Sequence, residues 1–199
     1  MLDPNLNVEK KETTNFTPLP ENMYTVELLD INSEKRPTYD TRNNPDDQKE
    51  YETVFNFQFV LLDGEEDGKS LRGRSVWNNF VPSYLYISSK NGKNRLYEIV
   101  EALQKQTVSP QQEAEGITGQ YLNSLVGKQT RIATENQTKG DKTYTQIVKF
   151  YQLSQNLDPL TKQEKVDATP KPKDEKAEQV ANEQFDEINS SDIPFDNQQ

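Results

Sequence analysis

The chain contains 199 residues, of which 31% are hydrophobic, and its formal net charge is −10. This apolar content is low for a globular protein, so we expect part of the chain to build no core. The lack of cysteine and histidine excludes disulfides, metal sites made of thiolates or imidazoles, and catalytic triads that use histidine. No apolar run is long enough to cross a bilayer and no signal-peptide pattern is present, so we expect a cytoplasmic protein.

Acidic and basic residues are unevenly distributed along the chain. Residues 1–68 carry 6 Lys or Arg and 16 Asp or Glu, residues 69–157 carry 12 and 6, and residues 158–199 carry 5 and 11. The middle segment therefore has a net charge of +6. Since salt screens charges beyond about 10 Å, a basic surface within this acidic protein can still bind phosphates.

The first fifty residues predict an arm, a strand and a long connection. Residues 1–17 are polar and lack periodicity, so we expect a flexible N-terminal arm. Alternating apolar side chains predict a first strand within residues 22–31. Residues 32–49 are charged and interrupted by prolines, which favours an extended loop or hairpin. Three side chains of this connection could reach a ligand: Arg36, Tyr39 and Arg42.

The strongest strand pattern lies in residues 51–61, where aromatic and β-branched residues alternate. An acidic turn follows at residues 63–68, and residues 76–81 predict a third strand that carries Trp77 and Phe80. The residues between turn and strand are basic: Lys69, Arg72 and Arg74. Cations for phosphates and flat rings for bases are what a single-stranded nucleic-acid binder needs. The alternative is a hairpin whose aromatic rings are buried in the core.

A helix is predicted between the third strand and the fourth. Apolar residues at positions i, i+3, i+4 and i+7 mark one face of a helix over residues 95–103, with Asn94 as its N-cap. Residues 104–119 are rich in glutamine and predict an exposed loop. Thr118 is a candidate cap for a short helix that ends near Leu125.

Two further strands complete the predicted domain. Residues 128–137 and 143–153 alternate as strands, and residues 138–141 form the hairpin turn between them. From residue 157 the chain is dominated by Pro, Lys, Glu, Asp and Gln, and no Lys or Arg follows position 176. Such a segment buries too little apolar surface to offset its ordering entropy, so we predict a disordered acidic tail over residues 157–199.

Five strands with a helix between the third and fourth have the connectivity of the OB-fold, a small Greek-key barrel. We therefore predict a mainly β protein with a five-stranded OB-fold-like barrel in residues 18–156. Its segments FNFQFVLLDGEEDGKSLRGRSVWNNF, RLYEIVEAL, LVGKQTRI and KTYTQIVKF resemble the phage-encoded single-stranded-DNA-binding proteins of OB type. This resemblance covers roughly residues 18–153. It implies a protein that coats and protects single-stranded DNA during replication, recombination or repair in a bacterial or phage-infected cell.

A second resemblance lies near the C-terminus. Asp192, Ile193, Pro194 and Phe195 are similar to the acidic tip of bacterial single-stranded-DNA-binding proteins, which docks on replication and repair partners. In that family the phenylalanine is terminal, whereas here four more residues follow it. The resemblance implies that partner proteins are recruited through the side chains of this motif.

The leading hypothesis is a non-enzymatic binder of single-stranded DNA without a cofactor or metal. Bases would stack on exposed rings drawn from Trp77, Phe80, Tyr84, Tyr86 and Tyr144. Phosphates would contact Lys69, Arg72, Arg74, Lys90, Lys93, Arg95, Lys128, Arg131, Lys139 and Lys142.

Two other functions compete with this hypothesis. In the first, the OB-like domain is a protein-interaction or structural phage module, and its basic residues are only solvated. In the second, clustered carboxylates hold Mg²⁺ in a nuclease, a site that the composition permits. The acidic residues concentrate in the 63–67 turn and the tail and are not paired on predicted strands, so the sequence favours a protein without enzymatic activity. Homo-oligomerisation is left open.

Overall fold

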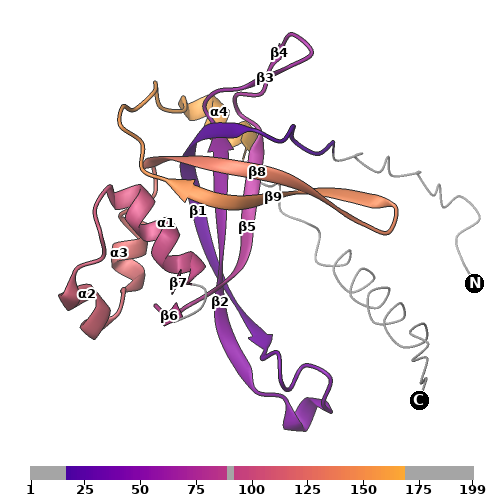
Figure 1. Ribbon diagram of the computed structural model, residues 1–199, viewed down its shortest axis with the longest axis vertical. Coiled ribbons are helices and arrows are strands. Elements are labelled where there is room, and N and C mark those ends of the chain that lie inside the picture. Colours follow the sequence, from indigo (N-terminus) through magenta and orange to yellow (C-terminus); the bar gives the residue numbers. More distant parts are fainter. Residues whose placement is uncertain (1–16, 89–91, 169–199) are drawn as a thin grey trace, which may run out of the picture. The chain divides into compact units, whose positions relative to one another are not determined.

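The computed structural model describes residues 17–88 and 92–168, which fold around a five-stranded antiparallel sheet (Figure 1). Its strand order is β5-β2-β1-β8-β9. The strands are β1 (Met23–Pro37), β2 (Tyr51–Leu61), β5 (Ser75–Pro82), β8 (Gln129–Lys139) and β9 (Lys142–Tyr151). Two short hairpins lie outside the main sheet. The first pairs β3 (Glu65–Glu66) with β4 (Lys69–Ser70), and the second pairs β6 (Ile87–Ser88) with β7 (Gly92–Lys93). The prediction of a mainly β protein with five principal strands is confirmed.

One face of the sheet packs into the core. Phe57 and Phe59 of β2 are fully buried, with ring centroids 6.4 Å apart. The helix α1 (Arg95–Gln104) begins after Asn94, whose side chain accepts a hydrogen bond from the Tyr97 backbone N–H, as its predicted capping role requires. The apolar face of α1 is buried and lies against both β5 and β9. The helix therefore covers β5 and β9, which are the two edge strands of the sheet.

The sheet is not closed by hydrogen bonds. Within the described residues β5 and β9 approach each other but form no ladder, so the predicted barrel closure is not found. The bulky α1 helix contacts both strands at this opening.

The connection between strands one and two is a hairpin, one of the two forms predicted for residues 32–49, but its strands are longer than expected. β1 continues to Pro37 and pairs with β2 as far as Tyr51, with a bulge between Leu28 and Asp30. The first strand is therefore longer than residues 22–31, and the predicted loop shrinks to residues 38–50, which include the 3-10 helix η1 (Asp46–Gln48). The charged residues Glu34, Lys35 and Arg36 in the extended part of β1 are exposed, whereas Val54 opposite Glu34 is buried.

The predicted loop over residues 104–119 contains a helix, α2 (Pro110–Glu115). A capping box stabilises it: the Ser109 side chain accepts from the Gln112 backbone N–H, and the Gln112 side chain accepts from the Ser109 N–H. The next helix, α3 (Gly119–Asn123), is capped by Thr118 as predicted.

Residues 158–168 pack on the outer face of the sheet, although the sequence predicts a disordered tail from residue 157. The buried side chain of Leu160 contacts Val60 and Leu62, and the helix α4 (Lys162–Ala168) follows it. The Lys165 ammonium lies 2.7 Å from the buried carboxylate of Glu27. Composition does not reveal this segment because one leucine and a few ion pairs to distant residues hold it in place. The rest of the predicted tail, residues 169–199, lies outside the described residues.

Candidate nucleic-acid interface

The β8–β9 hairpin turns one face toward the core and the other toward solvent. Ile132 and Phe150 are directly opposite each other and are both buried. Since directly opposed residues share a face and side chains alternate along a strand, their neighbours point outward. This outward surface, which we call the hairpin face, contains Arg131, Lys139, Lys142, Tyr144, Lys149 and Tyr151. All six are exposed.

The hairpin face brings together four of the predicted site residues and adds two. Lys149 and Tyr151 were missed because a bulge between Ala133 and Thr134 sets the register of this part of β9. The pattern of apolar residues along one strand does not reveal which partner residue lies opposite.

The hairpin face carries four cations, and one of them, Lys149, also lies beside Glu98 and Glu101 in a hollow between α1 and β9. Within the described residues, none of its four cations forms an ion pair. Lys139 and Lys142 are directly opposite each other next to the turn, an arrangement that is unfavourable without an anion. Glu135 is the acidic residue of β8 on the same side. A phosphate bound between the two lysines would relieve their repulsion.

Four other predicted phosphate contacts are held by intramolecular partners. Arg72 is the clearest case, because its guanidinium lies 2.7 Å from the Glu164 carboxylate and also donates to the backbone carbonyls of Leu62 and Pro159. Hydrogen bonds from Arg72 and from the Thr161 backbone N–H lower the pKa of Glu164 to about 2. Arg72 thus holds the 158–168 segment against the sheet. It could contact a phosphate only after its ion pair with Glu164 had broken.

The other three cations also form ion pairs with acidic residues of the chain. Their ion pairs are Arg74 with Glu66, Lys93 with Glu101, and Arg95 with Glu98. Lys69 in β4 and Lys128 before β8 are exposed and form no ion pair within the described residues, but they lie outside the hairpin face. Lys90 lies outside the described residues, as do the four tail residues with predicted partner contacts, 192–195.

Trp77 is half-buried and does not belong to the core. It pairs with Gln58, while the neighbouring pair of Phe59 and Val76 points inward, so Trp77 lies on the outer face of β5. Gln58 and Ser75 on that face both donate to the Ala168 carbonyl. The ring is therefore on the side of the sheet that the end of α4 contacts.

Tyr84 and Tyr86 are exposed in the segment between β5 and β6. Their backbone carbonyls accept hydrogen bonds from Asn94, the first from its side-chain amide and the second from its backbone N–H. The segment is thereby attached to the beginning of α1, and both phenol rings remain available to a ligand.

Phe80 is turned outward by a local irregularity of β5. The pairing with β2 shifts between Phe55 and Phe57, and Phe80 adopts a φ of 59°. A positive φ is strained for a bulky residue, and here the Asn56 side chain accepts a hydrogen bond of 2.9 Å from the Phe80 N–H. The ring is 47% exposed, and the guanidinium carbon of Arg36 lies 3.4 Å from its centroid. The bulge thus presents a ring already stacked with a cation.

A pocket of about 350 Å³ surrounds this stack at the far end of the β1–β2 hairpin. This distal pocket is lined by Arg36, Pro37, Tyr39, Arg42, Glu52, Val54 and Phe80. A second stack lines the same pocket, with the Arg42 guanidinium carbon 4.2 Å from the Tyr39 ring centroid. The sequence indicated that Arg36, Tyr39 and Arg42 could reach a ligand but gave no sign of Glu52, because the pairing of β1 with β2 determines that it lies there.

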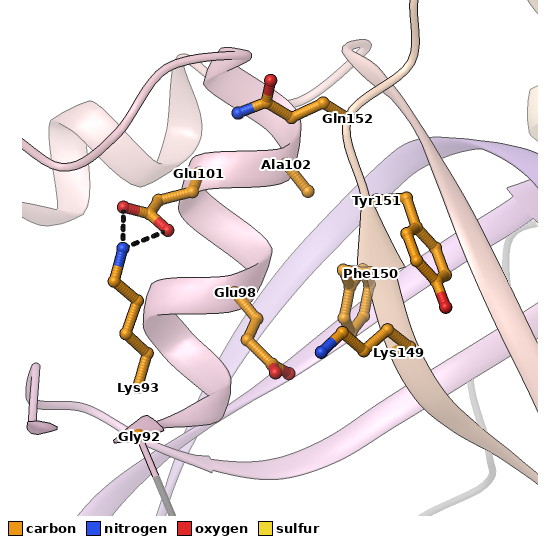
Figure 2. Close-up of a pocket in the computed structure, with 9 residues that line it drawn as sticks. All are labelled: Gly92, Lys93, Glu98, Glu101, Ala102, Lys149, Phe150, Tyr151 and Gln152. Atoms are coloured by element: carbon orange, nitrogen blue, oxygen red, sulfur yellow. Dashed lines mark hydrogen bonds and ion pairs between the residues drawn. The ribbon is translucent and has the colours of Figure 1, made fainter. Parts of the chain in front are cut away.

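A second hollow, of about 490 Å³, lies between α1 and β9 (Figure 2). Glu98 and Glu101 of α1 line it, and Figure 2 shows the Lys93 ammonium bonded to both oxygens of Glu101, at 2.6 and 2.7 Å. Lys149 and Tyr151 of the hairpin face line the same hollow, so this end of the face lies next to two carboxylates and is less favourable for a phosphate than the end with Lys139 and Lys142. Among the described residues, no group of three or more acidic side chains is arranged to hold a metal ion.

No family model matches the chain, and no curated protein sequence matches it either. None of the helices in residues 17–88 and 92–168 has the length and apolar character needed to span a membrane. The function is therefore argued from the geometry of the hairpin face and the distal pocket.

Proposed function

We propose that this chain is an OB-type protein that binds single-stranded DNA without enzymatic activity. It would coat and protect the strand during replication, recombination or repair. The hairpin face carries the proposal: it places four cations without ion-pair partners in the described residues beside the exposed rings of Tyr144 and Tyr151. Phosphates and bases of a single strand require these two kinds of side chain on one surface.

The strand order supports the OB assignment. Counting only the five principal strands, the order β5-β2-β1-β8-β9 reads 3-2-1-4-5, and a helix precedes the fourth strand. This is the connectivity of a five-stranded, partly open Greek-key barrel. In the described residues, α1 contacts both β5 and β9, and these two strands are not joined by ladder hydrogen bonds.

The position of the loops supports a strand-binding role. OB domains bind oligonucleotides on the face of the second and third strands, between the loop of strands one and two and the loop of strands four and five. Here the first loop carries the distal pocket and the second ends the hairpin face, and the two hairpins leave the sheet in different directions (Figure 1). The 158–168 segment packs on the outer side of β2, so a DNA strand between the two loops would pass beside this segment, where Trp77 is half-buried.

Partner recruitment follows from the second resemblance. The Asp192–Phe195 motif would bind replication or recombination proteins through its acidic and aromatic side chains. A pull-down with a peptide of this motif, against the same peptide with Phe195 replaced by alanine, tests this part independently of DNA.

Binding of a labelled thymidine oligonucleotide, followed by anisotropy and by Trp77 fluorescence, tests the central proposal. We expect binding at low salt that weakens by about 0.7 log units per contacted phosphate for each tenfold increase in salt. A duplex of equal length should compete poorly, because its bases are not free to stack. Absence of binding at low salt, or binding that salt leaves unchanged, would contradict the proposal and favour a protein-interaction module.

A further inference from the structure

The distal pocket combines stacking surfaces with the acidic side chain of Glu52. Arg36 forms its ion pair with Glu34, at 3.0 Å, although Glu52 is the residue directly opposite it in the β1–β2 ladder. Within the described residues, the Glu52 carboxylate makes neither a hydrogen bond nor an ion pair, and it is only half exposed at the pocket wall. An acid in this position is unexpected in a surface that only attracts phosphates.

The size and walls of the pocket suit one nucleobase. Its volume of about 350 Å³ exceeds that of a single purine, and its flat surfaces are the Phe80 ring with the Arg36 guanidinium and the Tyr39 ring with that of Arg42. Unstacked bases bind between aromatic rings and guanidinium planes and are then read by hydrogen bonds to their edges. Among the residues that line the pocket, Glu52 carries the carboxylate that can accept hydrogen bonds from a base edge.

Building on the proposed function, we propose that the distal pocket holds one unstacked base and that Glu52 makes it selective for guanine. An ionised carboxylate only accepts hydrogen bonds, through two oxygens. The Watson–Crick edge of guanine offers two adjacent donors, the N1–H and the N2 amino group, and so matches both oxygens. Thymine offers one N–H between two carbonyl oxygens, which the carboxylate repels.

The same reasoning ranks the other bases. Adenine and cytosine each offer an amino group beside a ring nitrogen that accepts hydrogen bonds, so either would form one bond and face one repulsive contact. Deoxyinosine keeps the N1–H and lacks the N2 amino group, so it would lose one of the two bonds. The predicted order is guanine first, inosine next, and thymine last.

The experiment compares oligonucleotides of about 12 thymidines, a length within the range that one OB domain covers. One central thymidine is replaced by guanine, by inosine or by adenine, and affinities are measured by anisotropy at fixed salt. A bidentate contact to a base discriminates by about fivefold to a hundredfold, so the guanine oligonucleotide should bind at least about fivefold more tightly than the thymidine one. The inosine oligonucleotide should fall between them.

Variants of the protein assign this preference to the carboxylate. In Glu52→Gln, the ratio of guanine to thymidine affinity should fall to nearly one. Glu50→Gln removes the same charge two residues away, from an exposed side chain that does not line the pocket, and should keep the ratio of the wild type. Thermal unfolding of both variants checks that the hairpin is intact.

The outcomes separate the two proposals. If no oligonucleotide binds at low salt, the proposed function fails and this inference with it. If all oligonucleotides bind equally well, DNA binding stands and guanine selectivity is wrong. A guanine preference that survives in Glu52→Gln would overturn the role of this carboxylate.

Discussion

Arg36 and Phe80 belong to strands that are separated by β2, yet the guanidinium carbon of Arg36 lies 3.4 Å from the centroid of the Phe80 ring. Val54 of β2, which is buried, lines the same pocket as these two residues. It depends on the positive φ of Phe80, which turns the ring toward solvent. The stack therefore links three strands at the end of the sheet where we place a base.

Replacing Phe80 by glycine should weaken DNA binding without unfolding the protein. Stacking on a ring contributes about 1–3 kcal/mol per base, so affinity for a thymidine oligonucleotide should fall by about fivefold to a hundredfold. Glycine adopts a φ of 59° without strain. This relief of strain should offset the stability that is lost with the contact between the ring and Arg36. Anisotropy measures the affinity for DNA, and thermal unfolding measures the stability of the variant. Phe80→Tyr keeps a ring and should retain most of the affinity; equal binding by the glycine variant would remove Phe80 from the interface.

The lysines that face each other across the β8–β9 turn should determine part of the salt dependence. Lys139→Gln and Lys142→Gln should each lower the slope of log affinity against log salt by about 0.7, as expected for one phosphate on a single strand. Neither substitution should reduce stability, since each removes a repulsion between directly opposed charges.

A matched control for these lysines is Lys105→Gln. The Lys105 ammonium bonds to Asn156 and lies outside the hairpin face, so its loss changes the net charge equally without removing a proposed contact. An equal decrease in slope for all three variants would mean that only the overall charge matters.

Local patterns predicted much of the fold. The alternation in residues 51–61 and the apolar spacing of residues 95–103 correspond to β2 and α1, and Asn94 caps the helix as predicted. The capping box of Ser109 and Gln112 was also readable, since serine followed three residues later by glutamine is a helix start, but the surrounding glutamines favoured a loop.

The parts of the site that sequence reasoning missed depend on pairing between distant residues. Arg72 and Glu164 are 92 positions apart, and nothing near Arg72 in the chain shows that its guanidinium is already occupied. Glu52 reaches the distal pocket because β1 extends to Pro37 and pairs with β2 in one register. Composition and periodicity describe single strands, whereas the register of two strands is fixed by bulges and contacts that neither strand reveals alone.

Two truncations should separate the 158–168 segment from the acidic residues that follow it. Residues 169–199 carry 3 Lys and 8 Asp or Glu, so their removal should tighten DNA binding at low salt by removing a competing polyanion. Truncation after Leu157 also removes Leu160, which packs on Val60 and Leu62, and should cost about 2–5 kcal/mol of unfolding free energy. Urea unfolding measures the free energy of unfolding of each truncated protein, and anisotropy measures its affinity for DNA. If the shorter truncation leaves affinity unchanged at low salt, the acidic residues do not compete with DNA.

The ion pair of Arg72 and Glu164 should make stability depend on pH in the acidic range. The pKa of Glu164 is lowered from its ordinary value of 4.5 to about 2, chiefly by the hydrogen bond from Arg72. A carboxylate with a lowered pKa in the folded state stabilises the protein above its unfolded pKa, and this contribution is lost as the pH falls toward the folded value. The difference in unfolding free energy between wild type and Glu164→Gln should therefore be constant above about pH 5 and shrink from about pH 4.5 toward pH 2. Urea unfolding at several pH values measures this difference, with Asp167→Asn on the same helix as the control. A difference that stays constant down to pH 3 would show that Glu164 gains no stability from this pair.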